Sequence, residues 1–108
     1  MANTFKLKTK ANVGVTTTAV YAVPSATTTV VIGVTLANTS GSSMNVGIGI
    51  NRGSQDDVKL MKSVPIPQGS SFEFMGGNKI VLETTDTLVA ESDVNSSLDV
   101  ALTIMEIT

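Results

Sequence analysis

The chain offers few side chains that could carry out chemistry. Its 108 residues include no histidine, no cysteine, no tryptophan and a single tyrosine. General acid–base catalysis relies most often on histidine, and zinc sites are built from cysteine, histidine or converging carboxylates. A nucleophilic triad would lack its base, and no serine–lysine spacing stands out in its place. The composition therefore predicts a protein that is not an enzyme and holds no cofactor.

Two groups of carboxylates remain as candidates for a site. Asp56 and Asp57, close to Asn51, could offer oxygen ligands to calcium. Adjacent side chains on an extended chain point apart and no EF-hand pattern is present, so an acidic loop tip is the favoured interpretation. Paired carboxylates for glycoside hydrolysis would have to come from Glu73, Glu83 and Glu91. Nothing in the sequence indicates a cleft around them, so no catalytic or metal site is predicted.

Charge is scarce along the whole chain. Charged residues make up 15% of it and hydrophobic residues 42%, whereas a typical domain has about 25% charged residues. The net charge of −2 gives no general attraction to nucleic acid or to an anionic membrane. The longest apolar run is far shorter than the ~20 residues that span a bilayer, and the N-terminus shows no signal-peptide pattern. A neutral surface rich in threonine and serine suits a domain surrounded by partner subunits.

The segment at residues 4–11 alternates apolar and basic side chains. Phe5 and Leu7 are predicted to face the core, and the lysines between and beyond them to face the other way. Lysines discourage unwanted pairing at the edge of a sheet, so this is an expected edge strand. The basic residues are Lys6, Lys8 and Lys10. Residues 1–11 therefore form a basic N-terminal strand or arm.

The two ends of the chain carry opposite charge. No basic residue follows Lys79, and six acidic residues lie after it: Glu83, Asp86, Glu91, Asp93, Asp99 and Glu106. The basic start and the acidic end could attract each other within one subunit or between neighbours. Solvated loop and edge charges are the favoured alternative, because exposed pairs contribute only ~0–1 kcal/mol.

Short alternating segments recur at nearly regular spacing, with turn residues between them. They are residues 4–11, 17–23, 29–38, 43–52, 57–64, 70–75, 79–83, 87–92 and 97–107. This pattern predicts an all-β fold, with one antiparallel β-sandwich or jelly-roll-like domain of eight or nine short strands over residues 1–108.

Alternation also predicts which side chains fill the core. Val30, Ile32, Val34 and Leu36 are expected to share one face of a central strand whose other face, with Val31, is also covered. The core face of the later strands is expected at Met44, Val46, Ile48 and Ile50, and at Leu98, Val100, Leu102 and Ile104. Phe72 and Phe74 are also in phase with the core, whereas Tyr21 is the one aromatic of exposed type. With so few exposed aromatics, stacking on sugars has little support.

Two pairs of residues lie on the faces opposite the predicted core. Met105 and Ile107 are apolar on the outer face of the last strand, which favours contact with another element or subunit. Gly47 and Gly49 leave their face without side chains. Either something approaches that face closely or, as favoured, the glycines mark a β-bulge or a strong twist.

The stretch from Tyr21 to Ile107 resembles small structural proteins of tailed bacteriophages, including cyanophage virion proteins. The residues that carry the resemblance are YAVP at 21–24, VVIGVTLANT at 30–39, VPIPQGSS at 64–71, GNKIVLE at 77–83, and the closing segment from LDV at 98–100 to EI at 106–107. The resemblance implies a non-enzymatic component of the virion, assembled in the host cytoplasm. Capsid decoration proteins of this kind are commonly small all-β domains that sit on the shell as trimers.

We therefore expect a capsid decoration or cement protein that bridges major capsid subunits as a homo-oligomer, with a trimer as the implied form. The alternative within the particle is a neck, tail or fibre component, and a glycan-binding module is a more remote one. Neither nucleic acid nor membrane is an expected partner. The predicted subunit or capsid contacts are Phe5, Lys6, Lys8, Lys10, Met105 and Ile107.

Overall fold

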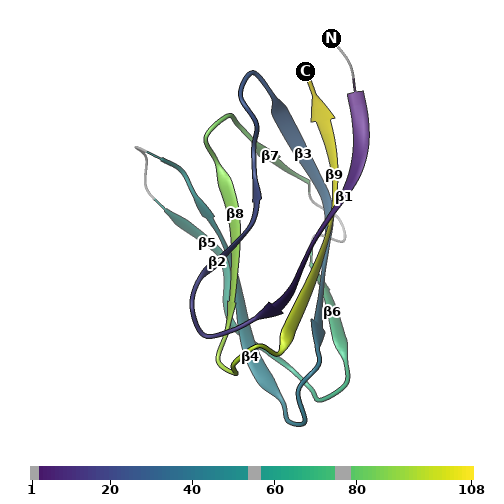
Figure 1. The fold of residues 1–108 in the computed structure, drawn as a ribbon, viewed down its shortest axis with the longest axis vertical. Coiled ribbons are helices and arrows are strands. Elements are labelled where there is room, and N and C mark those ends of the chain that lie inside the picture. The colour runs from purple at the N-terminus through teal and green to yellow at the C-terminus, as the bar shows by residue number, and fades with distance from the viewer. Residues whose placement is uncertain (1–2, 54–56, 75–78) are drawn as a thin grey trace.

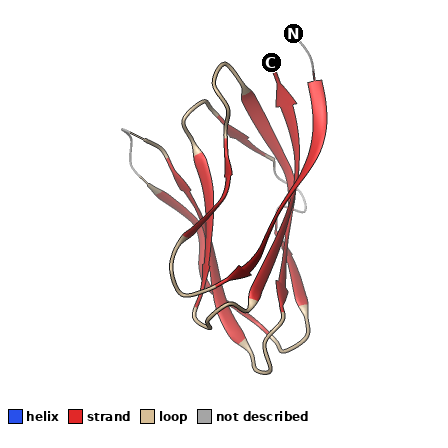
Figure 2. Cartoon of the chain, in the orientation of Figure 1, coloured by secondary structure: helices blue, strands red, loops and turns tan. Residues whose placement is uncertain are grey.

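Segments rich in β-branched side chains form nine strands in the computed structural model, which describes residues 3–53, 57–74 and 79–108 (Figure 1). A branched Cβ favours the pleated backbone. The strands are β1 (Asn3–Val13), β2 (Thr18–Ala22), β3 (Thr28–Asn38), β4 (Met44–Asn51), β5 (Val58–Ile66), β6 (Ser71–Phe74), β7 (Ile80–Leu82), β8 (Thr87–Ser92) and β9 (Leu98–Ile107). The described part of the chain contains strands and loops without a helix, as Figure 2 shows.

The strands pair into two antiparallel sheets that pack face to face. The larger sheet has the order β1-β9-β3-β6, and β7 pairs with β3 further along the same edge as β6. The smaller sheet has the order β2-β8-β4-β5. The pairing is nested, with the first strand on the last, β2 on β8 and β4 on β5. A long hairpin wrapped around itself gives this jelly-roll arrangement. The predicted fold class is confirmed, and the start of β1 and the end of β9 lie at one end of the sandwich (Figure 1).

The core lies between the sheets, and much of it comes from β4 and β9. The predicted core positions of β4, from Met44 to Ile50, are 7% exposed or less, and those of β9, from Leu98 to Ile104, are 2% exposed or less. Both core predictions are confirmed. Strict alternation sufficed here because one face of each strand packs against the opposite sheet.

In β3 the prediction that Val30, Ile32, Val34 and Leu36 share one face is wrong for the first half of the strand. Val31 is fully buried, while Val30 and Ile32 are half-buried on the other side. The register with β9 shifts between Val31 and Gly33, so one extra residue is inserted into β3. Such a β-bulge reverses the phase of alternation. Beyond it, Val34 and Leu36 share a face as predicted, and both are buried in the core.

In β1 the two faces are the reverse of those predicted. Phe5 is 71% exposed and Leu7 65%. The lysines stand opposite the core residues of β9, with Lys6 opposite Ile104 and Lys8 opposite Leu102. Directly opposed residues share a face, so the lysines point along the core side. An edge strand tolerates this because a lysine stem covers apolar surface while its ammonium reaches water, and inward charges protect the edge from pairing.

The expectation that Tyr21 is exposed is also wrong, since its side chain is buried in a polar network. Its hydroxyl donates to Oε2 of Glu106 at 2.5 Å and lies 2.8 Å from Oγ1 of Thr29. Nζ of Lys6 lies 2.8 Å from Oε1 of Glu106, whose side chain is 7% exposed. The basic start and the acidic end of the chain therefore meet within one subunit. For this pair the favoured alternative of solvated charges is wrong.

Gly47 and Gly49 lie in β4 where its pairing with β5 is irregular. The register shifts between Val46 and Ile48 and again between Ile48 and Gly49. A Cβ built on Gly49 would lie 2.9 Å from the carbonyl oxygen of Val58, closer than real Cβ atoms come. The backbone of β5 is thus the close neighbour, and the bulge interpretation of these glycines is confirmed.

The short strand β6, at the edge of the larger sheet, carries two aromatic residues. Phe72 stands opposite Leu36 on the core side, as predicted, but keeps 37% exposure at the sheet edge. The predictions for the side chain of Phe74, for Met75 and for the turn at 76–78 lie outside the described residues.

Candidate interaction surface

The apolar contact residues predicted from the sequence share the outer face of the larger sheet. Phe5 of β1 stands directly opposite Met105 of β9, and Ile107 stands between Asn3 and Thr28. Met105 and Ile107 are half-buried by their neighbours on the sheet. The register therefore brings Phe5, Met105 and Ile107 together, and their contact with a partner stays a prediction.

Phe5 and Met105 belong to a row of large apolar side chains that crosses the sheet. Met105 stands opposite Val30 of β3, which in turn stands opposite Val81 of β7. Val81 is 57% exposed. We call these four residues the large row. The sequence pattern did not indicate Val30 because of the bulge, or Val81 because a strand of three residues gives no clear alternation.

Two further rows lie beside the large row on the same face. The middle row is Leu7, Thr103 and Gly33, and the small row is Thr9, Ala101, Thr35 and Glu73. A shallow hollow of about 240 Å³ lies at the small row and extends beyond it along the strands. It is lined by Thr9, Ala101 and Thr35 together with Lys10, Ala11, Ala37, Asp99 and Val100. The large and middle rows contain no charged side chain, and charge depletion is typical of the centre of protein interfaces.

The three predicted basic contacts differ in what they can do. Lys6 is already paired with Glu106 of its own subunit. This pair helps fix the pKa of Glu106 below its ordinary value, chiefly through the hydrogen bond from Lys6 and then through that from Tyr21. Lys8 is half-buried along the core side, and Lys10 stands opposite the core residue Val100 and also borders the hollow beside the small row. Contact of any of these lysines with a partner stays a prediction.

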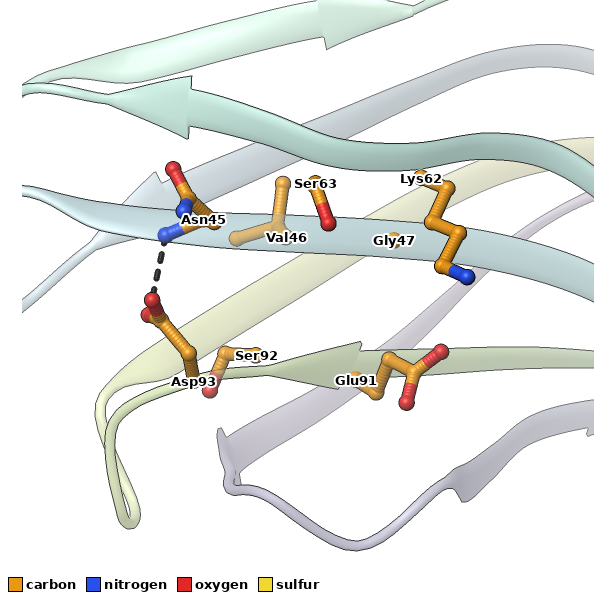
Figure 3. A pocket seen from close by; sticks show the side chains of 8 residues that line it. All are labelled: Asn45, Val46, Gly47, Lys62, Ser63, Glu91, Ser92 and Asp93. Atoms are coloured by element: carbon orange, nitrogen blue, oxygen red, sulfur yellow. Dashed lines mark hydrogen bonds between the residues drawn. The ribbon is translucent and has the colours of Figure 1, made fainter.

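A second hollow lies on the smaller sheet, at the β4–β5 bulge (Figure 3). Its volume is about 220 Å³, below the ~300–1,000 Å³ of typical ligand pockets. Lys62 and Glu91 flank the bare backbone of Gly47, and Asp93 accepts a hydrogen bond from the amide of Asn45 at 2.9 Å. Its lining contains no aromatic side chain, so a ligand site has little support there.

The carboxylates considered as site residues are tied to basic partners or lie apart. Arg52 donates to Glu83 and Asp86, each at 3.0 Å, and Lys59 pairs with Glu91 at 2.8 Å. Oδ1 of Asp57 accepts a hydrogen bond from the amide of Arg52. The prediction for Asp56 lies outside the described residues. Over residues 3–53, 57–74 and 79–108 no cluster of three potential metal ligands occurs, and no helix there is long and apolar enough to cross a membrane.

Comparison with known proteins supplies a fold and no family. No protein-family model matches the chain, and no curated protein matches it. One solved structure that is similar belongs to work described as "Bacillus endospore appendages form a novel family of disulfide-linked pili". The match has a TM-score of 0.58 and 13% sequence identity, and it covers 99% of this chain and 87% of that one. At this identity the likeness shows a shared β-sandwich fold.

Proposed function

We propose that this protein is a non-enzymatic structural subunit of a multi-subunit assembly, and specifically a capsid decoration protein of a tailed bacteriophage. The observation that carries the proposal is the outer face of the larger sheet, where the large and middle rows expose apolar side chains without charge. A folded domain gains nothing from leaving Phe5 and Leu7 in water, whereas burial against a partner gains ~25 cal/mol per Å² of apolar surface.

The bacteriophage assignment rests on the sequence resemblance between Tyr21 and Ile107. In this role the domain bridges major capsid subunits in the virion and associates with further copies of itself. A place in the neck, tail or a fibre of the same particle uses the same surface with a different partner. Tyr21 is buried, so the chain's single tyrosine is not free to stack on a sugar, and a glycan-binding module gains no support.

A pilus-like filament is the second candidate, because the similar solved structure is described as part of a family of disulfide-linked pili. A filament of this chain would need another means of linkage, since its sequence contains no cysteine. Association through apolar sheet faces would supply one. Both candidates give the chain a structural role, but the first places it in a virion and the second in a filament.

Immunogold electron microscopy distinguishes these roles. Antibody against the chain is applied to purified particles of the source, and the purified protein is imaged alone on a second grid. Label spread over particle heads supports capsid decoration, and label at the neck or tail supports the alternative position. Filaments formed by the purified protein, without label on particles, favour the pilus-like role. Unlabelled particles from cells that express the protein, with no filaments, contradict the proposal.

Replacing Met105 with glutamate is expected to weaken assembly at least ~10-fold without unfolding the domain. Met105 lies in the centre of the large row, and its side chain is half-buried on the outer face, away from the core. A carboxylate there would lose its water on association. Sedimentation velocity of the variant, with circular dichroism to check the fold, measures this. Unchanged association of a folded Met105→Glu variant would place the interface elsewhere.

A further inference from the structure

The large, middle and small rows run across the larger sheet, and they follow one another at regular steps along its strands. Leu7 and Thr103 of the middle row stand opposite each other, as do Thr103 and Gly33. In β1 and β9 the large row lies two residues to one side of the middle row, and the small row two residues to the other. Two residues of strand correspond to about 7 Å. The outer face therefore has a row of large side chains and a row of mostly small ones at equal distances from its middle.

Consider a two-fold axis that lies between two copies of the face and runs along the middle row, across the strands. About this axis the face is complementary to itself. When two copies pack face to face about such an axis, their strands run antiparallel and each strand lies over its own equivalent. Phe5 then lies over Thr9 of the second copy, and Met105 over Ala101. The same contacts recur in reverse, as an isologous interface requires. The large row of each copy thereby packs over the small row of the other, at the border of the hollow.

The middle row permits the two sheets to approach. A Cβ built on Gly33 meets no atom within 4 Å, so the surface above this residue is open. On the axis, Gly33, Thr103 and Leu7 would each face the equivalent residue of the second copy. Sheets that pack face to face lie about 10 Å apart, a distance that single layers of side chains fill. Gly33 and Thr103 are small on the axis, and Ile32 of the β3 bulge lies beside Gly33 towards the large row. The two Leu7 side chains close the contact at β1.

The size of the face fits a stable pair. β9 has 10 residues and so extends for about 33 Å, and four strand positions at about 4.8 Å give a width of about 19 Å. The face therefore covers roughly 600 Å² per copy, at the lower end of the ~600–1,000 Å² that each partner contributes to specific complexes. Glu73 and Asp99 fall at the margin, where charged side chains keep their water.

We propose that this face is the docking surface for a second copy of the chain, and that two copies pair through the larger sheet about a two-fold axis along the Leu7–Thr103–Gly33 row. The inference rests on the proposed role as an assembly subunit and names the partner of its apolar face. It leads to a dimer, or an assembly of dimers, in place of the trimer that the bacteriophage resemblance implies.

Opposite charges placed on the axis test the pairing. Leu7→Asp and Leu7→Lys each put like charges face to face, and each variant is expected to bind itself about 100-fold more weakly than the wild type. An equimolar mixture of the two is expected to restore the dimer, because Asp then faces Lys. Leu7 is 65% exposed in the single subunit, so both variants keep the fold. Sedimentation velocity measures the mass of each sample.

Two controls fix the register and the face. Phe5→Asp mixed with Phe5→Lys is not expected to restore the dimer, because these positions lie about 13 Å apart along the strands of the pair. Phe5→Asp mixed with Thr9→Lys is expected to restore it. Val15, which is 55% exposed in the loop between β1 and β2, serves as the matched control, and Val15→Asp leaves the wild-type mass unchanged.

The outcomes separate this inference from the proposed function. Heterodimers in the two matched mixtures support the two-fold pairing. A wild-type monomer or trimer, a dimeric Leu7→Asp variant, or mixtures that stay monomeric overturn it. Particles labelled by antibody while the wild-type protein sediments as a monomer would leave the structural role standing and remove the pairing. A confirmed dimer, with no antibody label on particles and no filaments, would support the pairing and contradict the proposed structural role.

Discussion

Replacing Glu106 with alanine is expected to lower the free energy of unfolding by about 3 kcal/mol. The carboxylate accepts a hydrogen bond from Tyr21 and pairs with Lys6, and its side chain is 7% exposed. Without it, Thr29 is the one remaining hydrogen-bond partner of the buried tyrosine hydroxyl among the described residues. A hydrogen bond from a buried donor to a charged acceptor contributes roughly 1.5–3 kcal/mol, and the cavity adds to this loss.

The same change is expected to loosen β1. This strand has 11 residues, of which Val13 is the buried one, and the Lys6–Glu106 pair ties its first half to β9. Chemical denaturation measures the loss of stability, and trypsin digestion reports exposure of the β1 backbone at its lysines. Glu91→Ala is the matched control, because Glu91 and Lys59 are 32% and 50% exposed and such a pair contributes little. Equal effects of the two substitutions would contradict the assigned role of Glu106.

The network also sets how stability depends on pH. The pKa of Glu106 is lowered in the fold, so its contribution is present above the unfolded value near 4.5 and is lost as the pH falls through the folded value. Burial, followed by the hydrogen bond to Glu106, raises the pKa of Tyr21 from 10.0 to about 12. Its contribution is present below pH 10 and is lost as the pH rises toward 12. Removing Glu106 should weaken both dependences.

The fold could be predicted because alternation is a local property of the sequence. β4 and β9 place one apolar side chain at every second position, and each buries that face against the opposite sheet. The regular spacing of turns then limits the fold to a β-sandwich. Nested pairing of the first and last strands adds contacts between distant residues, but it leaves the local pattern unchanged.

What could not be predicted depends on position within the sheet. The alternation of β1 separates Phe5 and Leu7 from the lysines, but it does not decide which set faces the core. At an edge, the methylene stem of a lysine covers the apolar surface on the core side as well as a leucine does. The extra residue in β3 has no sequence signal, since Val30, Val31 and Ile32 are all apolar. The partner of Tyr21 lies 85 residues away at Glu106.

Replacing Asn38 with aspartate is expected to be still more damaging, at about 4 kcal/mol, although the two side chains have nearly the same shape. The amide nitrogen of Asn38 donates to the carbonyl oxygens of Ser42, Ile66 and Pro67 at 2.8, 2.9 and 3.2 Å. Its oxygen accepts from the amide and hydroxyl of Ser40. The side chain, 3% exposed, thus ties the end of β3 to the following turn and to the end of β5.

Aspartate would keep the two hydrogen bonds that Asn38 accepts. It would lose those that Asn38 donates, and a carboxylate oxygen would instead repel three carbonyl oxygens. Protonation restores a donor, so the pKa of the introduced carboxyl is raised in the fold. The stability lost at neutral pH is therefore regained as the pH falls toward the unfolded value of about 3.9, opposite to the trend at Glu106. Thermal unfolding of Asn38→Asp at pH 7 and pH 4 measures both effects. Exposed Asn95 is the matched control, and Asn95→Asp should stay within about 0.5 kcal/mol of the wild type. If Asn38→Asp were equally mild, the hydrogen bonds of Asn38 would not hold this end of the sandwich together.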